Sequence, residues 1–191
     1  RDRALVLIKS IAAKTNAKLS CLDKNISDAI VSASSSLLED SKLMSHFPLD
    51  VFQTGSGTSS NMNANEVIAN LASEIAGQEV NPNDHVNFGQ SSNDVIPTTI
   101  HVSAAMSSKR KLIPAFEALR DEIIQKADSI KGYSKTGRTH LMDAMPIRMD
   151  QSLLSWADQI DAGIIGVDRA LTYICTLGLG GTAVGTGINT H

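Results

Sequence analysis

The sequence predicts a mostly α-helical protein. Apolar residues recur every three or four positions through six segments, which is the spacing that one face of an amphipathic helix requires. No segment between them keeps the period-two alternation of a half-buried strand. Aromatic residues make up 4% of the chain and hydrophobic residues 42%, so the core must be aliphatic. We therefore expect an all-α fold, with an N-terminal helical domain followed by the start of a long-helix bundle.

The first part of the chain holds three predicted helices. Their apolar positions run through residues 5–12, 22–37 and 61–76, and Gly77 is suited to end the third. The segment Asn81-Pro82-Asn83-Asp84 indicates a turn or the start of a helix. We expect the N-terminal domain to span residues 1–89 and the bundle domain to span residues 90–191.

The second part of the chain predicts longer helices. Pro97 suits the first turn of a helix that residues 111–130 continue, with Pro114 allowing a kink or a break. A polar loop is expected at residues 131–146. Residues 149–174 then carry the longest apolar stripe, and small residues accompany it. Such a wide apolar arc predicts a helix in the centre of a bundle or at a subunit interface, and we favour a homo-oligomer.

Composition limits the classes of function. A net charge of -3 and a pI near 5.9 argue against nucleic-acid binding, and no apolar run is long enough to span a membrane. Cys21 and Cys175 are expected to be buried free thiols in a cytoplasmic protein. No residue spacing indicates a metal site, and no cofactor is expected. Because the chain starts at Arg1 and stops just after a glycine-rich turn, we expect it to be a piece of a longer protein.

Short hydroxyl and amide side chains gather at residues 55–58, 90–94 and 137–144. The first two segments precede helices, whose N-termini favour anions. Each alone is more simply explained as a helix cap, but two such helix starts favour carboxylate binding. The third segment carries His140, which can transfer a proton near neutral pH. Its neighbours Arg138, Thr139 and Asp143 can orient the ring and attract a carboxylate. Together the segments predict a dicarboxylate site. The glycine-rich residues 178–187 lack the strand that a nucleotide-binding loop needs, so that function is rejected.

The combination of motifs resembles the fumarase/aspartase superfamily, and most closely its class II fumarases. The matching stretches are Gln53–Asn70 (QTGSGTSSNMNANEVIAN), Pro82–Thr98 (PNDHVNFGQSSNDVIPT), Gly137–Pro146 (GRTHLMDAMP) and Gly180–His191 (GGTAVGTGINTH). The resemblance covers essentially the whole chain. It implies the reversible hydration of fumarate to (S)-malate in the citric acid cycle by a metal-independent homotetramer, in which each active site combines segments of three subunits.

The resemblance also implies roles for individual residues. His140 is the proton-transfer residue tied to the catalytic water, and a second dicarboxylate site is possible at Asn81, Asn83 and Asp84. The residues implied to contact the substrate carboxylates, or to lie in the same loop, are Ser56, Gly57, Thr58, Ser91, Ser92, Asn93 and Thr139.

Two departures from the family pattern limit what this chain can do. The family's base is a serine in a mobile Gly-Ser-Ser loop followed by Met-Pro-x-Lys-x-Asn, and no such stretch occurs here. We therefore expect the fragment itself to be inactive. Many fumarases have His-Pro-Asn-Asp at the secondary site, whereas this chain has Asn81 in place of the histidine.

Two other functions remain open. An aspartate ammonia-lyase, or another lyase of the superfamily, would use the same scaffold, and residues 81–87 resemble aspartases as much as fumarases. A helical oligomer without activity is disfavoured, because a pure scaffold does not need three polar loops. Serine at position 56 and the Ser-Ser-Asn at 91–93 favour fumarase, since aspartases tend to have alanine and Ser-Thr-Asn there.

Overall fold

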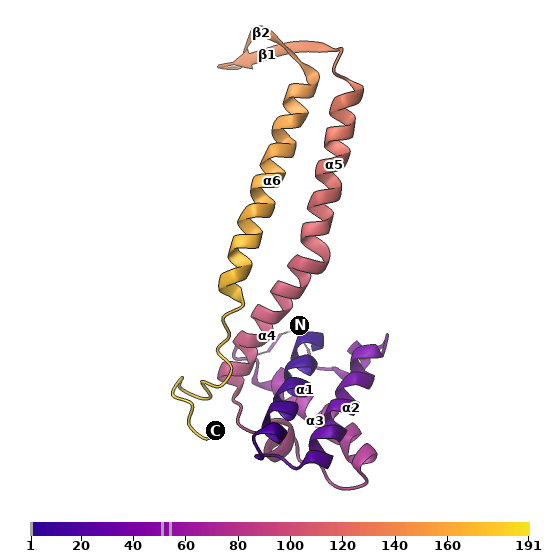
Figure 1. Cartoon of the computed structure of the whole chain (residues 1–191), viewed down its shortest axis with the longest axis vertical. Coiled ribbons are helices and arrows are strands. Elements are labelled where there is room, and N and C mark those ends of the chain that lie inside the picture. The colour runs from indigo at the N-terminus through magenta and orange to yellow at the C-terminus, as the bar shows by residue number, and fades with distance from the viewer. Residues whose placement is uncertain (1, 51, 54) are drawn as a thin grey trace. The chain divides into compact units, whose positions relative to one another are not determined.

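The computed structural model describes residues 2–50, 52–53 and 55–191. It contains two compact units, whose elements are labelled in Figure 1. The first unit comprises Arg1–Ser103 and Thr176–His191, and the second comprises Ala104–Cys175. The prediction of a mostly helical protein is confirmed. The division into domains at residues 89 and 90 stays a prediction about the complete protein.

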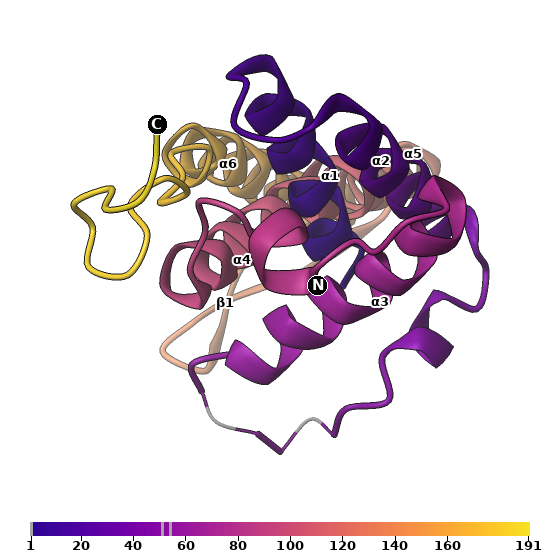
Figure 2. The same ribbon diagram turned by 90° about the horizontal axis from the view of Figure 1, so that it is seen from below.

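Three helices form the body of the first unit: α1 (Asp2–Lys18), α2 (Lys24–Glu39) and α3 (Thr58–Ala76), seen from below in Figure 2. Asp23 caps α2, because its carboxylate accepts the N–H groups of Asn25 and Ile26. Gly77 ends α3 in the left-handed region, at φ 63°. The shared aliphatic core is built from Val6, Ala13, Leu22, Ala29, Ile30, Ala33, Leu37, Leu43, Ile68, Ala69, Ala72, Val80 and Val86.

Two short helical turns connect these helices to the rest of the unit. A 3₁₀ turn, η1, covers Leu43–His46, and a π turn, η2, covers Pro82–Val86. Asn81 caps η2, because its side-chain oxygen accepts the N–H groups of Asn83 at 2.8 Å and Asp84 at 3.0 Å. The prediction of a turn or helix start at residues 81–84 is confirmed.

Helix α4 (Ser92–Ser107) starts in the first unit and joins its core. Leu5, Ala64 and Val95 form a second buried cluster that links α1, α3 and α4, and Leu179 of the C-terminal segment packs against it. A π turn, η3 (Ser108–Leu112), separates α4 from α5 (Ile113–Ser129). Pro114 lies in the first turn of α5 and lacks the N–H for a regular helical bond, which agrees with the irregularity expected there.

The second unit is a helical hairpin of α5 and α6 (Met149–Ile174), which lie side by side in Figure 1. Arg120 of α5 donates a hydrogen bond to Asp161 of α6 at 2.8 Å. Many large apolar side chains of the two helices are uncovered in this chain, among them Leu119, Ile124, Leu154, Trp156 and Ile165.

The prediction of a polar loop at residues 131–146 is wrong. Strands β1 (Ser134–Thr139) and β2 (Met142–Arg148) pair there as an antiparallel hairpin, with an irregular register between Thr136 and Arg138. Nearly all residues of both strands are exposed, so no face is buried and no alternation marks them. His140 and Leu141 form the two-residue turn, with φ of 51° and 62°.

Cys21 and Cys175 are both free, as predicted. The expectation that they are buried is wrong, because Cys175 is exposed and Cys21 is only partly covered. In the stretches 2–50, 52–53 and 55–191, none of the helices has the length and apolar character needed to cross a lipid bilayer.

Candidate functional site

The start of α4 is a capping box. The Ser91 hydroxyl oxygen accepts the N–H of Asn93 at 3.2 Å, and the Asp94 carboxylate accepts the N–H of Ser91 at 2.9 Å. The cap interpretation of this segment is therefore correct, but it does not compete with binding. Capping uses only an acceptor position of the Ser91 hydroxyl, so its hydrogen is available for an anion.

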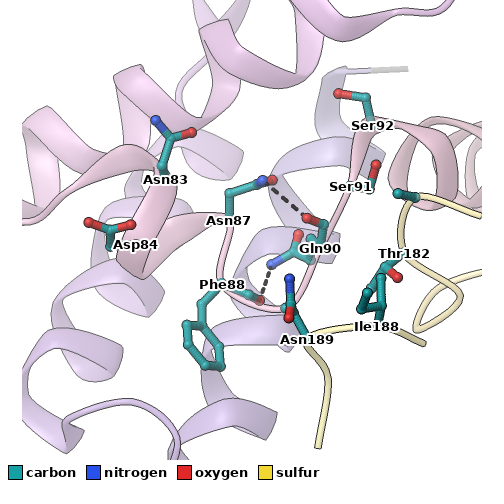
Figure 3. A pocket seen from close by; sticks show the side chains of 12 residues that line it. Asn83, Asp84, Asn87, Phe88, Gln90, Ser91, Ser92, Thr182, Ile188 and Asn189 are labelled. Atoms are coloured by element: carbon teal, nitrogen blue, oxygen red, sulfur yellow. Dashed lines mark hydrogen bonds between the residues drawn. The ribbon is translucent and has the colours of Figure 1, made fainter.

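A cavity of about 510 Å³ opens beside this helix start. Figure 3 shows Asn83 and Asp84 of η2 on one side of it and Thr182 of the C-terminal segment on the other, with Ser91 and Ser92 above. The lining residues are Asn83, Asp84, Asn87, Phe88, Gly89, Gln90, Ser91, Ser92, Thr182, Ala183, Ile188 and Asn189.

The cavity offers mainly neutral polar groups. Hydroxyl and amide side chains dominate its polar lining, and among the described lining residues Asp84 is the one with a formal charge. Ser92 is the first residue of α4, so the positive end of the helix dipole lies at the cavity wall. This arrangement suits a small ligand held by several hydrogen bonds, with the helix terminus favouring its negative charge.

The structure brings together some of the predicted site residues. Ser91 and Ser92 share the cavity with Asn83 and Asp84 of the possible secondary site. Asn81 is not a lining residue, since its side chain caps η2. Asn93 is exposed, and its amide donates to the Ala183 carbonyl at 2.8 Å, which ties the C-terminal segment to α4.

The Gly55-Ser56-Gly57-Thr58 segment packs against α4 outside the cavity. Gly57 has φ 70°, and a Cβ atom built there would lie 2.9 Å from Cγ1 of Ile96, so the start of α3 packs closely on the second turn of α4. Ser56 and Thr58 are exposed, with their hydroxyl oxygens 3.4 Å apart. Neither they nor Gly57 line the cavity.

Asn61 links the two helix starts directly. This residue lies in the first turn of α3 and is 1% exposed. Its side-chain nitrogen donates to the Ser92 hydroxyl oxygen at 3.1 Å and to the side-chain oxygen of Asn87 at 3.3 Å. The Ser92 hydroxyl, at the cavity wall, therefore accepts a hydrogen bond from a buried residue of α3.

Thr139 and His140 lie in the second unit, whereas the other predicted site residues lie in the first. Both are exposed at the tip of the β1–β2 hairpin, where Thr139 pairs with Met142. Arg138 forms a 3.5 Å ion pair with Asp143 across the strands, so this carboxylate is engaged by the arginine. The chain thus carries predicted site residues in both compact units.

Sequence reasoning missed Thr182 as a site residue. Its backbone adopts φ 56°, and its N–H donates to the buried Asp94 carboxylate at 2.8 Å. The hydroxyl oxygen of Thr182 is buried beside the cavity and has no hydrogen-bond partner in the described part of the chain. The glycine-rich stretch around it carries part of the family resemblance, but its residue types alone do not mark Thr182 as a site residue.

Comparison with known proteins gives the family. The model of a lyase family matches residues 1–191. A class II fumarate hydratase of Pseudomonas aeruginosa is 55% identical over 189 residues, covering 99% of this chain and 41% of the relative. One from Halobacterium salinarum is 50% identical over 194 residues, covering 99% and 41%. The chain thus spans about two fifths of these relatives.

Solved structures agree with this result. The crystal structure of a class II fumarase from Schistosoma mansoni matches with a TM-score of 0.94 and 41% identity, covering 99% of this chain and 40% of that one. A fumarate lyase:delta crystallin from Brucella melitensis, bound to cobalt, matches with a TM-score of 0.92 and 39% identity, covering 99% and 42%. The chain therefore belongs to the lyase family that this model describes, within the fumarase/aspartase superfamily that its motifs indicate.

Proposed function

We propose that the complete protein to which this chain contributes is a class II fumarate hydratase, which hydrates fumarate reversibly to (S)-malate. The observation that carries the proposal is the pair of hydroxyls, Ser91 and Ser92, on one polar cavity at the N-terminus of α4. The class II fumarate hydratases among its relatives support the same substrate class. A dicarboxylate matches both the hydrogen-bond donors and the helix terminus.

The reaction removes a proton from carbon and develops negative charge on the adjacent carboxylate. Donors that stabilise this charge lower the barrier. We assign this binding role to Thr58, Ser91, Ser92, Asn93 and Thr139, with Ser56 and Gly57 in the same loop as Thr58. His140 exchanges the proton of the water that adds to the double bond.

This chain alone does not carry the whole reaction. The base loop and the lysine and asparagine that the resemblance implies do not occur in its 191 residues. We therefore expect the isolated chain to show no hydratase turnover. Asn83 and Asp84 make up the remainder of the proposed secondary dicarboxylate site, whose first residue, Asn81, is committed to capping η2.

We further propose that the complete protein is a homotetramer of the citric acid cycle in the cytoplasm. The uncovered apolar side chains of α5 and α6 support assembly, because helices of this length bury such residues against neighbouring helices. The two predicted site residues in the second unit, Thr139 and His140, then act in an active site assembled from several subunits.

The second candidate function is that of an aspartate ammonia-lyase. It would use the same dicarboxylate cavity and the same kind of proton transfer. Residues 81–87 (NPNDHVN) favour it as much as they favour the hydratase. Serine at position 56 and the Ser-Ser-Asn at 91–93 favour the hydratase.

The test is the ultraviolet absorbance of fumarate formed by the complete enzyme, with malate in one cuvette and aspartate in the other. Absorbance that rises with malate alone supports the hydratase. A rise with aspartate alone assigns the chain to the ammonia-lyases and overturns the proposal. The isolated 191-residue chain, measured in parallel, should give no signal with either substrate.

A further inference from the structure

Lys9 of α1 is a fully buried lysine directly behind the cavity. Its side chain is 0% exposed, and its ammonium group donates to the side-chain oxygens of Asn87 at 2.8 Å and Gln90 at 2.9 Å. Asn87 and Gln90 both line the cavity. These partners lie 78 and 81 residues further along the chain, so the contact ties α1 to the segment that carries Ser91 and Ser92.

Burying the Lys9 ammonium group costs free energy, because the charge loses its hydration. Burial lowers the pKa of Lys9 to about 7, while the Asp94 carboxylate raises the pKa in part. Within the part of the chain that the structure describes, the hydrogen-bond partners of the ammonium group are two neutral amides. An apolar side chain of similar length would not pay the free-energy cost of taking a charge out of water. The stability of the fold therefore gives no reason for a lysine at this position.

The polarity of the neighbouring hydrogen bonds depends on Lys9. Lys9 donates to the side-chain oxygen of Asn87 at 2.8 Å, so this oxygen faces Lys9 and the amide nitrogen faces away from it. That oxygen also accepts from the side-chain nitrogen of Asn61, which orients the Asn61 amide. The same nitrogen then donates its second hydrogen to the Ser92 hydroxyl oxygen. Ser92 is thereby an acceptor toward Asn61, and its own hydrogen is left for the cavity.

We propose that Lys9 is a positioning residue for substrate binding, which acts through Asn87 and Asn61 to hold the Ser92 hydroxyl as a hydrogen-bond donor to a ligand carboxylate. The inference rests on the proposed dicarboxylate function of the cavity. Without Lys9, the Asn87 amide keeps only its longer hydrogen bonds, to the Gln90 carbonyl at 3.4 Å and from Asn61 at 3.3 Å, and loses the contact at 2.8 Å that fixes its orientation. Asn61 can then turn its oxygen toward Ser92, and the serine donates to Asn61 instead of to the ligand.

The test is a double-mutant cycle in the complete enzyme, using Lys9→Met, Ser92→Ala and the double variant. We expect each single change to raise KM for malate roughly fivefold, the scale of one neutral hydrogen bond, with a smaller change in kcat. The double variant should be no worse than Ser92→Ala, because both changes remove the same donor. Lys14→Met, on the exposed side of the same helix, is the matched control and should leave KM unchanged.

A merely structural role would give a different pattern. Lys9→Met would then lower the thermal midpoint and its effect on KM would add to that of Ser92→Ala, and this result overturns the proposal. Asn61→Leu removes the hydrogen bonds of Asn61 to Asn87 and Ser92 by a second, independent route. Its effect on KM should likewise not add to that of Ser92→Ala. An unchanged KM in both Lys9→Met and Asn61→Leu also overturns it.

Failure of the hydratase assignment can be distinguished from failure of this inference. If the wild-type enzyme converts only aspartate, KM for aspartate is measured for the variants of the double-mutant cycle instead. Aspartate, like malate, offers a carboxylate to the Ser92 hydroxyl. If the enzyme turns over neither compound, calorimetric titration with malate gives Kd for the same four proteins. A non-additive loss of affinity supports the role of Lys9 in every case, and additive or absent effects reject it.

Discussion

The backbone N–H of Thr182 donates to the buried carboxylate of Asp94 at 2.8 Å, across 88 residues of sequence. The same carboxylate oxygen accepts the N–H of Gly180 at 3.1 Å, and the other oxygen accepts the N–H of Ser91. One side chain therefore fixes both the start of α4 and the glycine-rich segment that forms the opposite wall of the cavity. Asp94 is 3% exposed, so its charge is satisfied by these backbone groups rather than by water.

Asp94→Asn should detach the C-terminal wall of the cavity. The new amide places an NH₂ group where a carboxylate oxygen accepted backbone hydrogens, which leaves N–H groups unpaired in a buried place. We expect the free energy of unfolding of the complete protein to fall by about 2–3 kcal/mol. Urea denaturation measures this loss, and faster hydrogen exchange at residues 180 and 182 locates it. Asp28→Asn, on an exposed face of α2, is the control and should change neither quantity.

Gly57→Ala should be more damaging than Gly77→Ala. Both glycines have φ near the left-handed region, at 70° and 63°, so both changes carry a backbone penalty of about 1–2 kcal/mol. Of these two glycines, Gly57 is the one whose added Cβ meets a neighbour, at 2.9 Å from Cγ1 of Ile96, whereas no atom of the other described residues lies within 4 Å of a Cβ at Gly77.

Thermal unfolding of the two variants measures the difference. Ile96→Ala, combined with Gly57→Ala, should recover part of the loss because it clears the contact. Equal midpoints for Gly57→Ala and Gly77→Ala would show that the start of α3 does not pack on α4 as described.

Thr182→Val should weaken substrate binding while leaving the fold intact. Valine preserves the shape of the side chain but removes the buried hydroxyl, whose oxygen has no partner in the described chain. If a bound carboxylate satisfies this hydroxyl, KM for malate rises by roughly 3- to 10-fold. Thr186→Val, in the exposed part of the same segment, is the control. A Thr182→Val enzyme with higher stability and an unchanged KM would mean that the hydroxyl is an unused polar group.

Lys9 should make the stability of the protein depend on pH in an alkaline window. Burial lowers its pKa from 10.5 to about 7, against the opposing effect of Asp94. Between these two values the unfolded chain holds a proton that the native protein has released. The free energy of unfolding therefore rises with pH in this window, by at most about 1.4 kcal/mol per pH unit. Below pH 7 both states are protonated and the native state bears the full penalty.

Lys9→Met removes this dependence. Its stability relative to wild type should be most favourable at pH 6 and should decline towards pH 10. Urea denaturation at a fixed protein concentration, at pH 6, 7.5 and 9, measures the change. Lys14→Met, which removes an exposed side chain of the same helix, is the control. Parallel curves for wild type and Lys9→Met would contradict the lowered pKa.

The sequence predicted the elements that carry a regular apolar stripe. The stripe in residues 149–174 coincides with α6 because its spacing is that of one helix face, although among the described apolar residues of α6 only Ala157 and Leu171 are buried in this chain. The hairpin at residues 134–148 was missed for the converse reason, since its strands bury almost nothing in this chain and no alternation marks them. Its turn also lacks the glycine or asparagine that normally marks a two-residue hairpin, because His140 and Leu141 occupy those positions.

The parts of the candidate site were predicted unequally. Ser91 and Ser92 stand at a helix start that short-range patterns reveal. Lys9 gave no signal, because a lysine in an amphipathic helix is normally solvated and its partners lie about 80 residues away. Only the fold brings α1 against this segment.

His140→Asn should separate catalysis from binding. Asparagine tolerates positive φ better than most residues, so it fits the turn that His140 occupies at φ 51°, and the hairpin should be retained. The substitution removes the imidazole, and with it a group that can exchange a proton near neutral pH. We expect kcat for malate in the complete enzyme to fall by roughly 100-fold or more, while KM changes by less than about threefold.

Leu141→Gly is the matched control for the turn. It relieves a bulky residue from φ 62° without touching the imidazole, so kcat should stay within about twofold of wild type if the turn is kept. Steady-state rates and the thermal midpoints of both variants are measured together. A His140→Asn enzyme with wild-type kcat would remove this histidine from the mechanism. A fall in KM together with kcat would instead indicate that His140 strains the bound substrate.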